Sequence, residues 1–339
     1  MANQKLTASK IAVVGGESLL GREVRELLAE SGLKAEIELV ATDEAADTGI
    51  LTEHAGEMVL MRSLEAADWT GSRIVVLAGS PESSHRALGV AHRRAKGAAV
   101  IDVTGELEDL PEARLRAPML EATGPPAKDG LFVIAHPAAI ALALFLTRLH
   151  AITPVARALV LVFEPASERG KPGLDELQQQ TAALLSLKKV PKKVFDAQAA
   201  FNVLPEYGED APRSLADVEH RIERHLASLL ERSNTAPMPS LRVVHAPVFH
   251  GYGISVWAEF EKNPGANALA AGLQTAGIDV RGKDLEAPSN AGAAGQSGIT
   301  VGAIAADRND ARACWFWIVA DNLRLSGDNA VEVARGILE

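Results

Sequence analysis

The chain has 339 residues, of which 47% are hydrophobic, so its length suggests two domains with enough apolar material for a core. Its single cysteine, Cys314, excludes an intramolecular disulfide and a cysteine-based metal cluster within one chain, and the formal net charge of −10 argues against general binding to nucleic acid or to an anionic membrane. No apolar run reaches the ~20 residues of a membrane span, and residues 1–10 lack the apolar core of a secretory signal, so we expect a cytoplasmic protein.

The first predicted unit is a strand, a glycine-rich turn and a helix. Residues 10–14 are a β-branched apolar run, residues 15–21 read GGESLLG, and apolar residues at helical spacing follow as far as Gly32. Such a turn lets the backbone approach a pyrophosphate and directs a helix N-terminus at it, although a tight connection without a ligand has the same pattern. The residues expected to contact a dinucleotide are Gly15, Gly16, Ser18, Leu19, Leu20, Gly21, Thr42 and Gly79.

The second predicted strand, residues 36–41, ends where the adenine ribose lies in a dinucleotide-binding fold. Thr42, Asp43 and Glu44 follow it. An acidic residue at this point suits a free ribose hydroxyl and repels a 2′-phosphate, which favours NAD over NADP. The alternative is that Asp43 and Glu44 form a solvated loop.

The rest of the first half alternates strands with helices. Strands are predicted at residues 73–78 and 98–102 with a helix between them, and short connections of this kind give a parallel, doubly wound sheet. Residues 105–130 contain four prolines and several acidic residues, and we expect them to form a surface excursion.

The turn at Pro137 is the position around which the chain is organised. An apolar run ending at Ala135 meets this proline and becomes an alanine-rich helix. Where a strand enters a helix N-terminus, the helix dipole can stabilise an anion or lower the pKa of a thiol. Ala138 and Ala139 follow the proline here, and a methyl group performs neither nucleophilic nor acid–base chemistry. The turn is therefore either an active-site turn without its reactive residue or an ordinary buried junction.

The second half is predicted to be α+β, with antiparallel strands and helices on one side. Residues 164–170 form a polar loop that could line a site, residues 200–205 a compact buried turn, and residues 215–232 a charged helix with a solvated face. The predicted strands are residues 158–163, 241–248, 253–260 and 314–320, and the other predicted helices are residues 172–187 and 329–338.

Several short motifs occur in a specific order along the chain. They are Val14-Gly15-Gly16 through Gly21, Val100-Ile101-Asp102, Pro137 with its helix, Ser167 with Gly170, Gly173-Leu174-Asp175-Glu176-Leu177, Ala200-Phe201-Asn202-Val203-Leu204-Pro205, Pro247-Val248 and Val319-Ala320-Asp321-Asn322-Leu323-Arg324. In this joint order and spacing the chain resembles the aspartate-semialdehyde dehydrogenase family over essentially its whole length.

The resemblance implies an α/β fold: a Rossmann-type doubly wound parallel sheet with an inserted α+β dimerisation and substrate domain. The dinucleotide-binding domain would comprise residues 1–136 plus 320–339, and the inserted domain residues 137–319. Family members are amino-acid biosynthetic oxidoreductases that reduce an acyl phosphate to a semialdehyde with NADPH through a cysteine thioester. The resemblance also implies a homodimer.

The chain departs from the family at the positions that carry its chemistry. Ala139 stands in the place of the nucleophilic cysteine, and Tyr252 in the place of the histidine that relays the proton. The glutamine that orients the site falls at Glu164, the arginine that binds the substrate carboxylate at His245, and the arginine that binds phosphate at or near Glu108. In the cofactor turn, Ser18 replaces the middle glycine and Glu17 replaces a small hydroxyl residue, so binding of NAD or NADP is expected to be weakened.

The leading hypothesis is a family member without the family's NADP-dependent reaction, that is, a pseudoenzyme or a repurposed homologue, because loss of a nucleophile costs roughly a factor of 10⁶ in a well-studied hydrolase. One alternative is an active dehydrogenase with a different nucleophile, for which Cys314 must lie near Pro137. Another is a dinucleotide-binding regulatory or partner-binding module. His136, His245, His250 and Tyr252 could converge on one pocket, but the preferred interpretation is three hydrogen-bonded or surface histidines. No metal site is expected, since His245 and His250 are five apart on a presumed strand.

Overall fold

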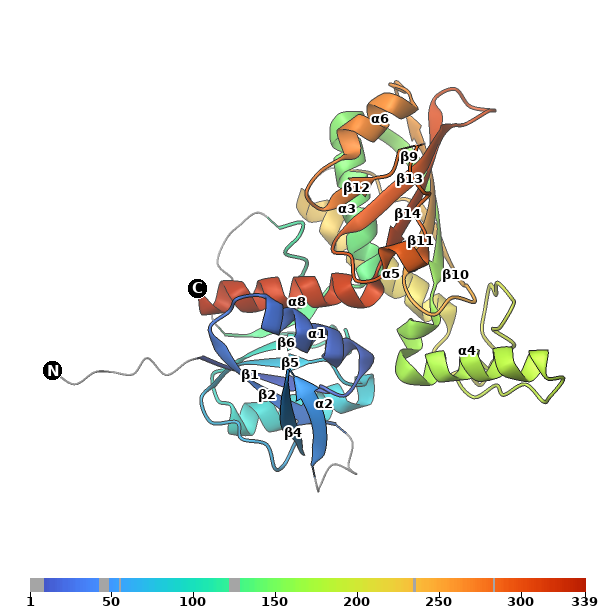
Figure 1. The fold of residues 1–339 in the computed structure, drawn as a ribbon. Helices are drawn as coiled ribbons and strands as arrows, with labels where there is room; N and C mark the ends of the chain where they lie inside the picture. The colour runs from blue at the N-terminus through green and yellow to red at the C-terminus, as the bar shows by residue number, and fades with distance from the viewer. Residues whose placement is uncertain (1–8, 43–48, 55, 122–128, 234–235, 283) are drawn as a thin grey trace. The chain divides into compact units, whose positions relative to one another are not determined.

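The computed structural model describes residues 9–42, 49–54, 56–121, 129–233, 236–282 and 284–339. The chain divides into two compact units (Figure 1). The first unit consists of two segments, Met1–Ala135 and Ser326–Glu339. The second unit is the segment between them, His136–Leu325. The second unit is therefore inserted within the sequence of the first.

The first unit is built on an eight-stranded sheet in the order β3-β4-β2-β1-β5-β6-β8-β7. All neighbouring strands pair in parallel except β3, which is antiparallel to β4. The strands are β1 (Ser9–Val14), β2 (Ala35–Ala41), β3 (Ile50–His54), β4 (Glu57–Ser63), β5 (Ser72–Leu77), β6 (Ala99–Asp102), β7 (Ala113–Arg116) and β8 (Leu131–Ile134). The predicted α/β fold with a parallel sheet is confirmed.

Apolar side chains of the central strands and of one helix make a core on one face of this sheet. Helix α2 (Pro81–Arg94) packs Ala87, Val90 and Ala91 against alternate residues such as Ala12 and Val75. Helix α1 (Leu19–Glu30) follows β1, and Gly327 of α8 (Asn322–Leu338) lies so close to Leu27 of α1 that a Cβ would approach it within 2.5 Å. The crossovers β1–α1–β2 and β5–α2–β6 are those of a doubly wound sheet.

Within residues 105–130, which were predicted to form a surface excursion, the structure has a strand that was not predicted, β7. Strand β7 pairs in parallel with β8 at the edge of the sheet. Its sequence, ARLR, carries a charge at every second position, and a four-residue edge strand gives little apolar signal.

The second unit contains a six-stranded mixed sheet in the order β10-β9-β11-β14-β13-β12. Neighbouring strands in the order β9-β11-β14-β13 pair antiparallel, while at the edges β10 pairs in parallel with β9 and β12 with β13. The strands are β9 (Val155–Glu164), β10 (Ser240–His245), β11 (Tyr252–Phe260), β12 (Ile278–Val280), β13 (Ile299–Ala306) and β14 (Ala313–Ala320). The helices are α3 (Pro137–Ile152), the 3₁₀-helix η2 (Ala166–Arg169), α4 (Gly170–Leu185), α5 (Leu215–Ser233), α6 (Ala266–Leu273) and α7 (Asn290–Ala293).

One face of the second sheet is covered by helices. Phe145 of α3 packs edge-on against Phe316 of β14, with ring centroids 5.0 Å apart. The charged helix predicted at residues 215–232 is α5, and its apolar stripe, which includes Ile222 and Leu226, is fully buried. The prediction of a compact buried turn at residues 200–205 is wrong: the side chains of Phe201 and Val203 are 62% and 56% exposed.

Within the described part of the chain, no helix is both long and apolar enough to cross a membrane.

Candidate functional site

The first turn of α3 contains no reactive side chain. Pro137 occupies the first helical position, where its fixed φ suits a helix start, and the side chains of Ala138 and Ala139 are both 0% exposed. His136 caps the helix: its Nδ1 accepts a hydrogen bond from the backbone N–H of Ala138 at 3.3 Å. The position predicted for the nucleophile is thus a methyl group sealed in the protein core.

The contacts of His136 fix which of its ring nitrogens carries the proton. Burial lowers the pKa of His136 well below its ordinary value, with a further contribution from neighbouring His225 and arginine side chains, so the ring is neutral at physiological pH. Because Nδ1 accepts from Ala138, the proton lies on Nε2, which is 3.5 Å from the hydroxyl oxygen of Tyr252. His136 is therefore a hydrogen-bond donor here and not a base.

Tyr252 occupies the predicted position of the proton-relaying histidine but is unsuited to that task. Its side chain is fully buried, and burial together with the adjacent carboxylate of Glu168 raises its pKa well above the ordinary value for tyrosine. A phenol that stays protonated at neutral pH cannot act as a general base. Its hydroxyl is instead hydrogen-bonded to Glu168.

Glu168 is the group of this set that can exchange a proton near neutral pH. Burial and the charge of Glu164 raise the pKa of its carboxyl to about 7. Its Oε1 accepts a hydrogen bond from Asn322 Nδ2 at 2.8 Å, and its Oε2 lies 3.8 Å from His136 Nε2. Asn322 is held in turn by Ser167 Oγ at 3.1 Å and by the Gly251 N–H at 3.0 Å, both donating to its Oδ1.

A second buried polar group surrounds Glu164, which is fully buried at the end of β9. Arg169 Nη2 lies 2.9 Å from Glu164 Oε1, and the guanidinium stacks over the ring of Tyr207 at 5.1 Å. The Tyr207 hydroxyl lies 3.1 Å from the same Glu164 oxygen and 3.0 Å from Nδ1 of His245, which is the register partner of Glu164 in the β9–β10 ladder. Through its ion pair with Glu164, Arg169 therefore places a positive charge near His245, although the two residues belong to different segments of the chain.

Burial and the Arg169 charge shift the pKa values of the ionisable groups in this second set. Burial and the nearby Arg169 charge lower the pKa of His245 to about 4, so the imidazole is neutral. Burial raises the pKa of Glu164, opposed by the charge of Arg169. Glu164 Oε2, Arg169 Nε and His245 Nε2 are buried without a hydrogen-bond partner in the described protein. Such atoms are unfavourable alone and suit a small polar molecule with both donor and acceptor groups.

The motif at residues 173–177 has a structural role. Glu176 accepts hydrogen bonds from the backbone N–H groups of Lys193 at 2.6 Å, Val194 at 2.7 Å and Phe195 at 3.2 Å. Phe195 then packs against the rings of Tyr207 and His245. A Cβ on Gly173 would lie 2.3 Å from the carbonyl oxygen of Ala166, so only glycine allows α4 to pack this closely on η2. These contacts position the second buried set.

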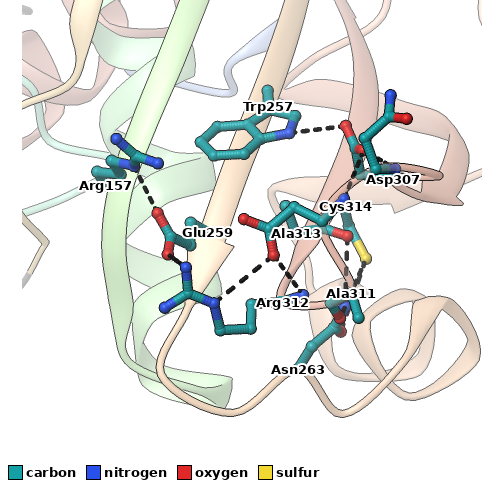
Figure 2. Close-up of polar contacts among 11 residues, drawn as sticks. Arg157, Trp257, Glu259, Asn263, Asp307, Ala311, Arg312, Ala313 and Cys314 are labelled. Carbon is teal, nitrogen blue, oxygen red and sulfur yellow. Dashed lines mark hydrogen bonds and ion pairs between the residues drawn. The ribbon is translucent and has the colours of Figure 1, made fainter.

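Cys314 lies far from the position predicted for the nucleophile. It is buried in β14, where it pairs with Ala258, whereas Tyr252 pairs with Ala320 in the same ladder. Six residues of strand, or about 20 Å, separate the two rows. The thiol contacts Asn263, as Figure 2 shows, and burial raises its pKa. The alternative in which Cys314 lies near Pro137 is therefore wrong.

Glu108 and the three histidines lie in different surroundings. Glu108 belongs to the turn after β6 in the first unit, where Asp102 orders the chain by accepting from the backbone N–H groups of Thr104 and Leu107, both at 2.9 Å. His136 and Tyr252 come together as proposed, but His245 belongs to the second buried set and His250 lies in the β10–β11 loop. Among the residues that the structure describes, no group of three or more His, Cys, Asp or Glu side chains could hold a metal ion.

In the first unit, the glycine-rich turn is shaped by contacts within the protein. A Cβ on Gly15 would lie 2.3 Å from Gly79 Cα, and one on Gly21 would lie 1.9 Å from the Gly15 carbonyl oxygen. Ser18 caps α1 by accepting from the Gly21 N–H at 2.8 Å, and its hydroxyl donates to the Ala78 carbonyl at 2.5 Å. The ends of β1 and β5 therefore meet at this turn. The side chains of Leu19 and Leu20 are half-buried.

The end of β2 joins the same turn through Glu17. Its Oε1 accepts hydrogen bonds from Thr42 N at 2.8 Å and Thr42 Oγ1 at 2.5 Å, and its Oε2 is buried without a partner in the described protein. A buried acceptor fits a sugar hydroxyl and does not fit a phosphate. Asp43 and Glu44, which were expected at the ribose, lie outside the described residues.

Sequence reasoning missed Glu168, Arg169, Tyr207, Asn322 and His225 as site residues. The first two lie in the polar loop at residues 164–170 that was expected to line a site, and Asn322 lies in a motif that carried the resemblance. Tyr207 and His225 gave no local signal, because their roles arise from the packing of a loop and of α5.

The sequence model of the semialdehyde dehydrogenase dimerisation domain matches residues 146–325, just over half of the chain. The chain belongs to the semialdehyde dehydrogenase family. An aspartate-semialdehyde dehydrogenase of Rickettsia bellii is 29% identical over 97% of both chains, and a USG-1 protein homolog of Azotobacter vinelandii is 28% identical over 98% of both.

The solved structures agree with this membership. A probable aspartate-semialdehyde dehydrogenase from Pseudomonas aeruginosa has a TM-score of 0.83 at 27% identity, covering 97% of this chain and 98% of that one. The aspartate-semialdehyde dehydrogenase of Candida albicans, solved with NADP, shares the fold with a TM-score of 0.66 at 14% identity, covering 98% of both chains.

Proposed function

We propose that this protein is a dimeric member of the aspartate-semialdehyde dehydrogenase family that does not perform the family's phosphate-dependent oxidation of a semialdehyde. The observation that carries the proposal is Ala139, a fully buried methyl group in the first turn of α3. The reaction needs a thiolate that attacks the aldehyde and a base that takes the proton. Two side chains lie beside this turn. Tyr252 keeps its phenol proton because its pKa is raised, and His136 is a neutral imidazole because its pKa is lowered.

The test is an assay of the purified protein with aspartate semialdehyde, phosphate and either NAD or NADP, followed by nicotinamide absorbance. We expect no reaction above background with either cofactor. Ala139→Cys is the matched variant, and we expect it to remain inactive because a cysteine without a base does not restore the unit. Phosphate-dependent turnover that Tyr252→Phe or Glu168→Gln abolishes would overturn the proposal.

The proposed dimer forms through the face of the second sheet that the helices leave uncovered. Leu159, Trp257 and Trp315 are register partners across β9, β11 and β14, so their side chains share one face. Leu159 and Trp315 are 51% and 44% exposed. Trp317 continues this face beside Phe163, with ring centroids 5.7 Å apart. A half-exposed apolar face of this kind is typical of an interface, and the matched dimerisation domain supports a second copy as its occupant.

At one end of this face, hydrogen bonds and ion pairs fix the positions of its side chains (Figure 2). Asp307 Oδ2 accepts hydrogen bonds from the indole N–H groups of Trp257 at 2.9 Å and Trp315 at 2.8 Å. Glu259 is held between Arg157 and Arg312, each 2.5 Å away, and the Arg157 guanidinium lies over the Trp257 ring. The aromatic side chains are therefore fixed before a partner binds, which lowers the entropic cost of association.

Light scattering after gel filtration tests the dimer. The wild-type chain should have twice the mass of one chain, and Leu159→Glu should have the mass of one, because the substitution places a charge in the centre of the apolar face. Leu185→Glu, on the exposed end of α4, is the control and should remain dimeric. A monomeric wild type, or a dimer that Leu159→Glu leaves intact, would contradict this interface.

We further propose that the carboxyl ends of β1, β2 and β5 bind a dinucleotide more weakly than a typical Rossmann site does. The candidate contacts remain Gly15, Gly16, Ser18, Leu19, Leu20, Gly21, Thr42 and Gly79. Weak binding is expected because the side chains of Ser18 and Thr42 are already bonded to the protein. When bound, the dinucleotide would supply hydride acceptance, and a bound nucleotide without catalysis would make the protein a regulatory or partner-binding module.

A further inference from the structure

Glu17 occupies an unusual place for a carboxylate. It lies in the turn between β1 and α1, two residues before the helix begins, where a dinucleotide fold presents backbone N–H groups to phosphate. An anion is unfavourable beside a pyrophosphate, so the position of the Glu17 side chain decides what the turn can bind.

The Glu17 side chain reaches across to the end of β2. Its Oε1 accepts both the backbone N–H and the hydroxyl of Thr42, at 2.8 and 2.5 Å. These two bonds fix the carboxylate at the strand end where dinucleotide folds use an acidic residue to bind the ribose. Thr42 is also close to β5, since a Cβ on Gly79 would lie 2.8 Å from its Cγ2. Glu17 therefore stands where three strand ends meet.

One oxygen of this carboxylate has no hydrogen-bond partner among the described residues. Glu17 Oε2 is buried, and no donor of the described protein reaches it. A carboxylate oxygen only accepts hydrogen bonds, so its complement is a donor such as a sugar hydroxyl. A 2′-phosphate offers only acceptors at neutral pH and carries the same sign of charge.

We propose that Glu17 is the residue that binds the adenine ribose hydroxyl and makes this protein specific for NAD over NADP. The inference rests on the proposed dinucleotide site and adds its specificity-determining residue. It requires neither turnover nor any residue of the second unit, because Glu17, Thr42 and Gly79 all belong to the first.

Calorimetric titration of the full chain with NAD and with NADP tests the proposal. We expect NAD to bind about tenfold more tightly than NADP or better. Glu17→Gln keeps an oxygen for Thr42 but removes the charge, and it should bring the two affinities within about threefold of each other. Glu26→Gln, an exposed position on α1, removes the same charge and should leave the preference unchanged. Circular dichroism confirms that each variant is folded.

The outcomes separate this inference from the proposed function. Equal affinity of the wild type for NAD and NADP, or a preference for NAD that survives Glu17→Gln, overturns the assignment of Glu17 and leaves the dinucleotide site standing. Absence of binding by both cofactors at millimolar concentration overturns the site and the assignment together.

Discussion

The two helix starts, at α1 and at α3, differ in the groups that they leave available to a ligand. At α1, Ser18 caps the helix, and the neighbouring Glu17 keeps one acceptor without a partner in the described chain. At α3, His136 caps the helix, and the next three residues are a proline and two alanines with buried methyl groups. Recognition of a ribose needs one acceptor, whereas acyl transfer needs a thiolate and a base together. Retained binding of a nucleotide is therefore compatible with the proposed loss of the family's reaction.

The largest expected effect is on the buried ion pair that stabilises the second unit. Arg169→Met removes the guanidinium that lies 2.9 Å from Glu164 and leaves this buried carboxyl without its cation. We expect the free energy of unfolding to fall by about 3–5 kcal/mol, measured by denaturant titration. The control is Lys171→Met, which removes an exposed ion pair with Asp175 and should cost about 0.5 kcal/mol or less. A loss below about 1 kcal/mol for Arg169→Met would mean that Glu164 is not charged.

A smaller effect concerns Glu168 and its dependence on pH. The pKa of this carboxyl is about 7 in the folded protein against 4.5 in the unfolded chain, so the folded state binds the proton more tightly. Stability from this group is full below pH 4.5 and declines as the pH rises to about 7. At about 1.4 kcal/mol per pKa unit, the decline is a few kcal/mol at most.

Glu168→Gln isolates this contribution. The variant should match the wild type near pH 4 and be more stable at pH 8, as measured by chemical denaturation at each pH. The comparison with the wild type is needed because His136 and His245, buried and neutral, lose stability in the opposite direction as the pH falls below 6.5. A constant difference between the two proteins across this range would show that Glu168 ionises normally.

The smallest effect is expected at the start of α1. Ser18→Ala removes the cap on the Gly21 N–H and should cost about 1 kcal/mol, whereas Ser18→Gly should cost only a few tenths. Thermal unfolding of the two variants measures the difference. Equal losses would show that the bond from Ser18 to the Ala78 carbonyl, which both variants lack, matters more than the cap.

Much of the fold could be predicted from the sequence because its strands are continuous apolar runs. β1, β5 and β14 lie within one residue of the predicted ranges. Strands β3, β4, β7, β12 and β13 were not predicted. The edge strands β3 and β7 are short and rich in polar residues, so they give little apolar signal.

The candidate site was predictable only where the motifs that carried the family resemblance aligned residues from distant parts of the chain. Convergence of four residues was considered possible, and of these His136 and Tyr252 meet. Arg169 was not foreseen as the cation beside His245, because residues on η2 and β10 come together only through the pairing of β9 with β10. Glu17 was noted as unfavourable to phosphates, but its contact with Thr42 depends on where β2 ends.

The most direct test of the central claim is a single-turnover experiment without phosphate. Protein at a concentration near that of the cofactor is mixed with aspartate semialdehyde and NAD, and separately with NADP, and nicotinamide absorbance is recorded over time. An enzyme that forms a thioester releases one equivalent of reduced cofactor in a burst, even when the acyl group cannot leave. With Ala139 in the first turn of α3, we predict no burst with either cofactor. One equivalent of reduced cofactor per chain would contradict the account.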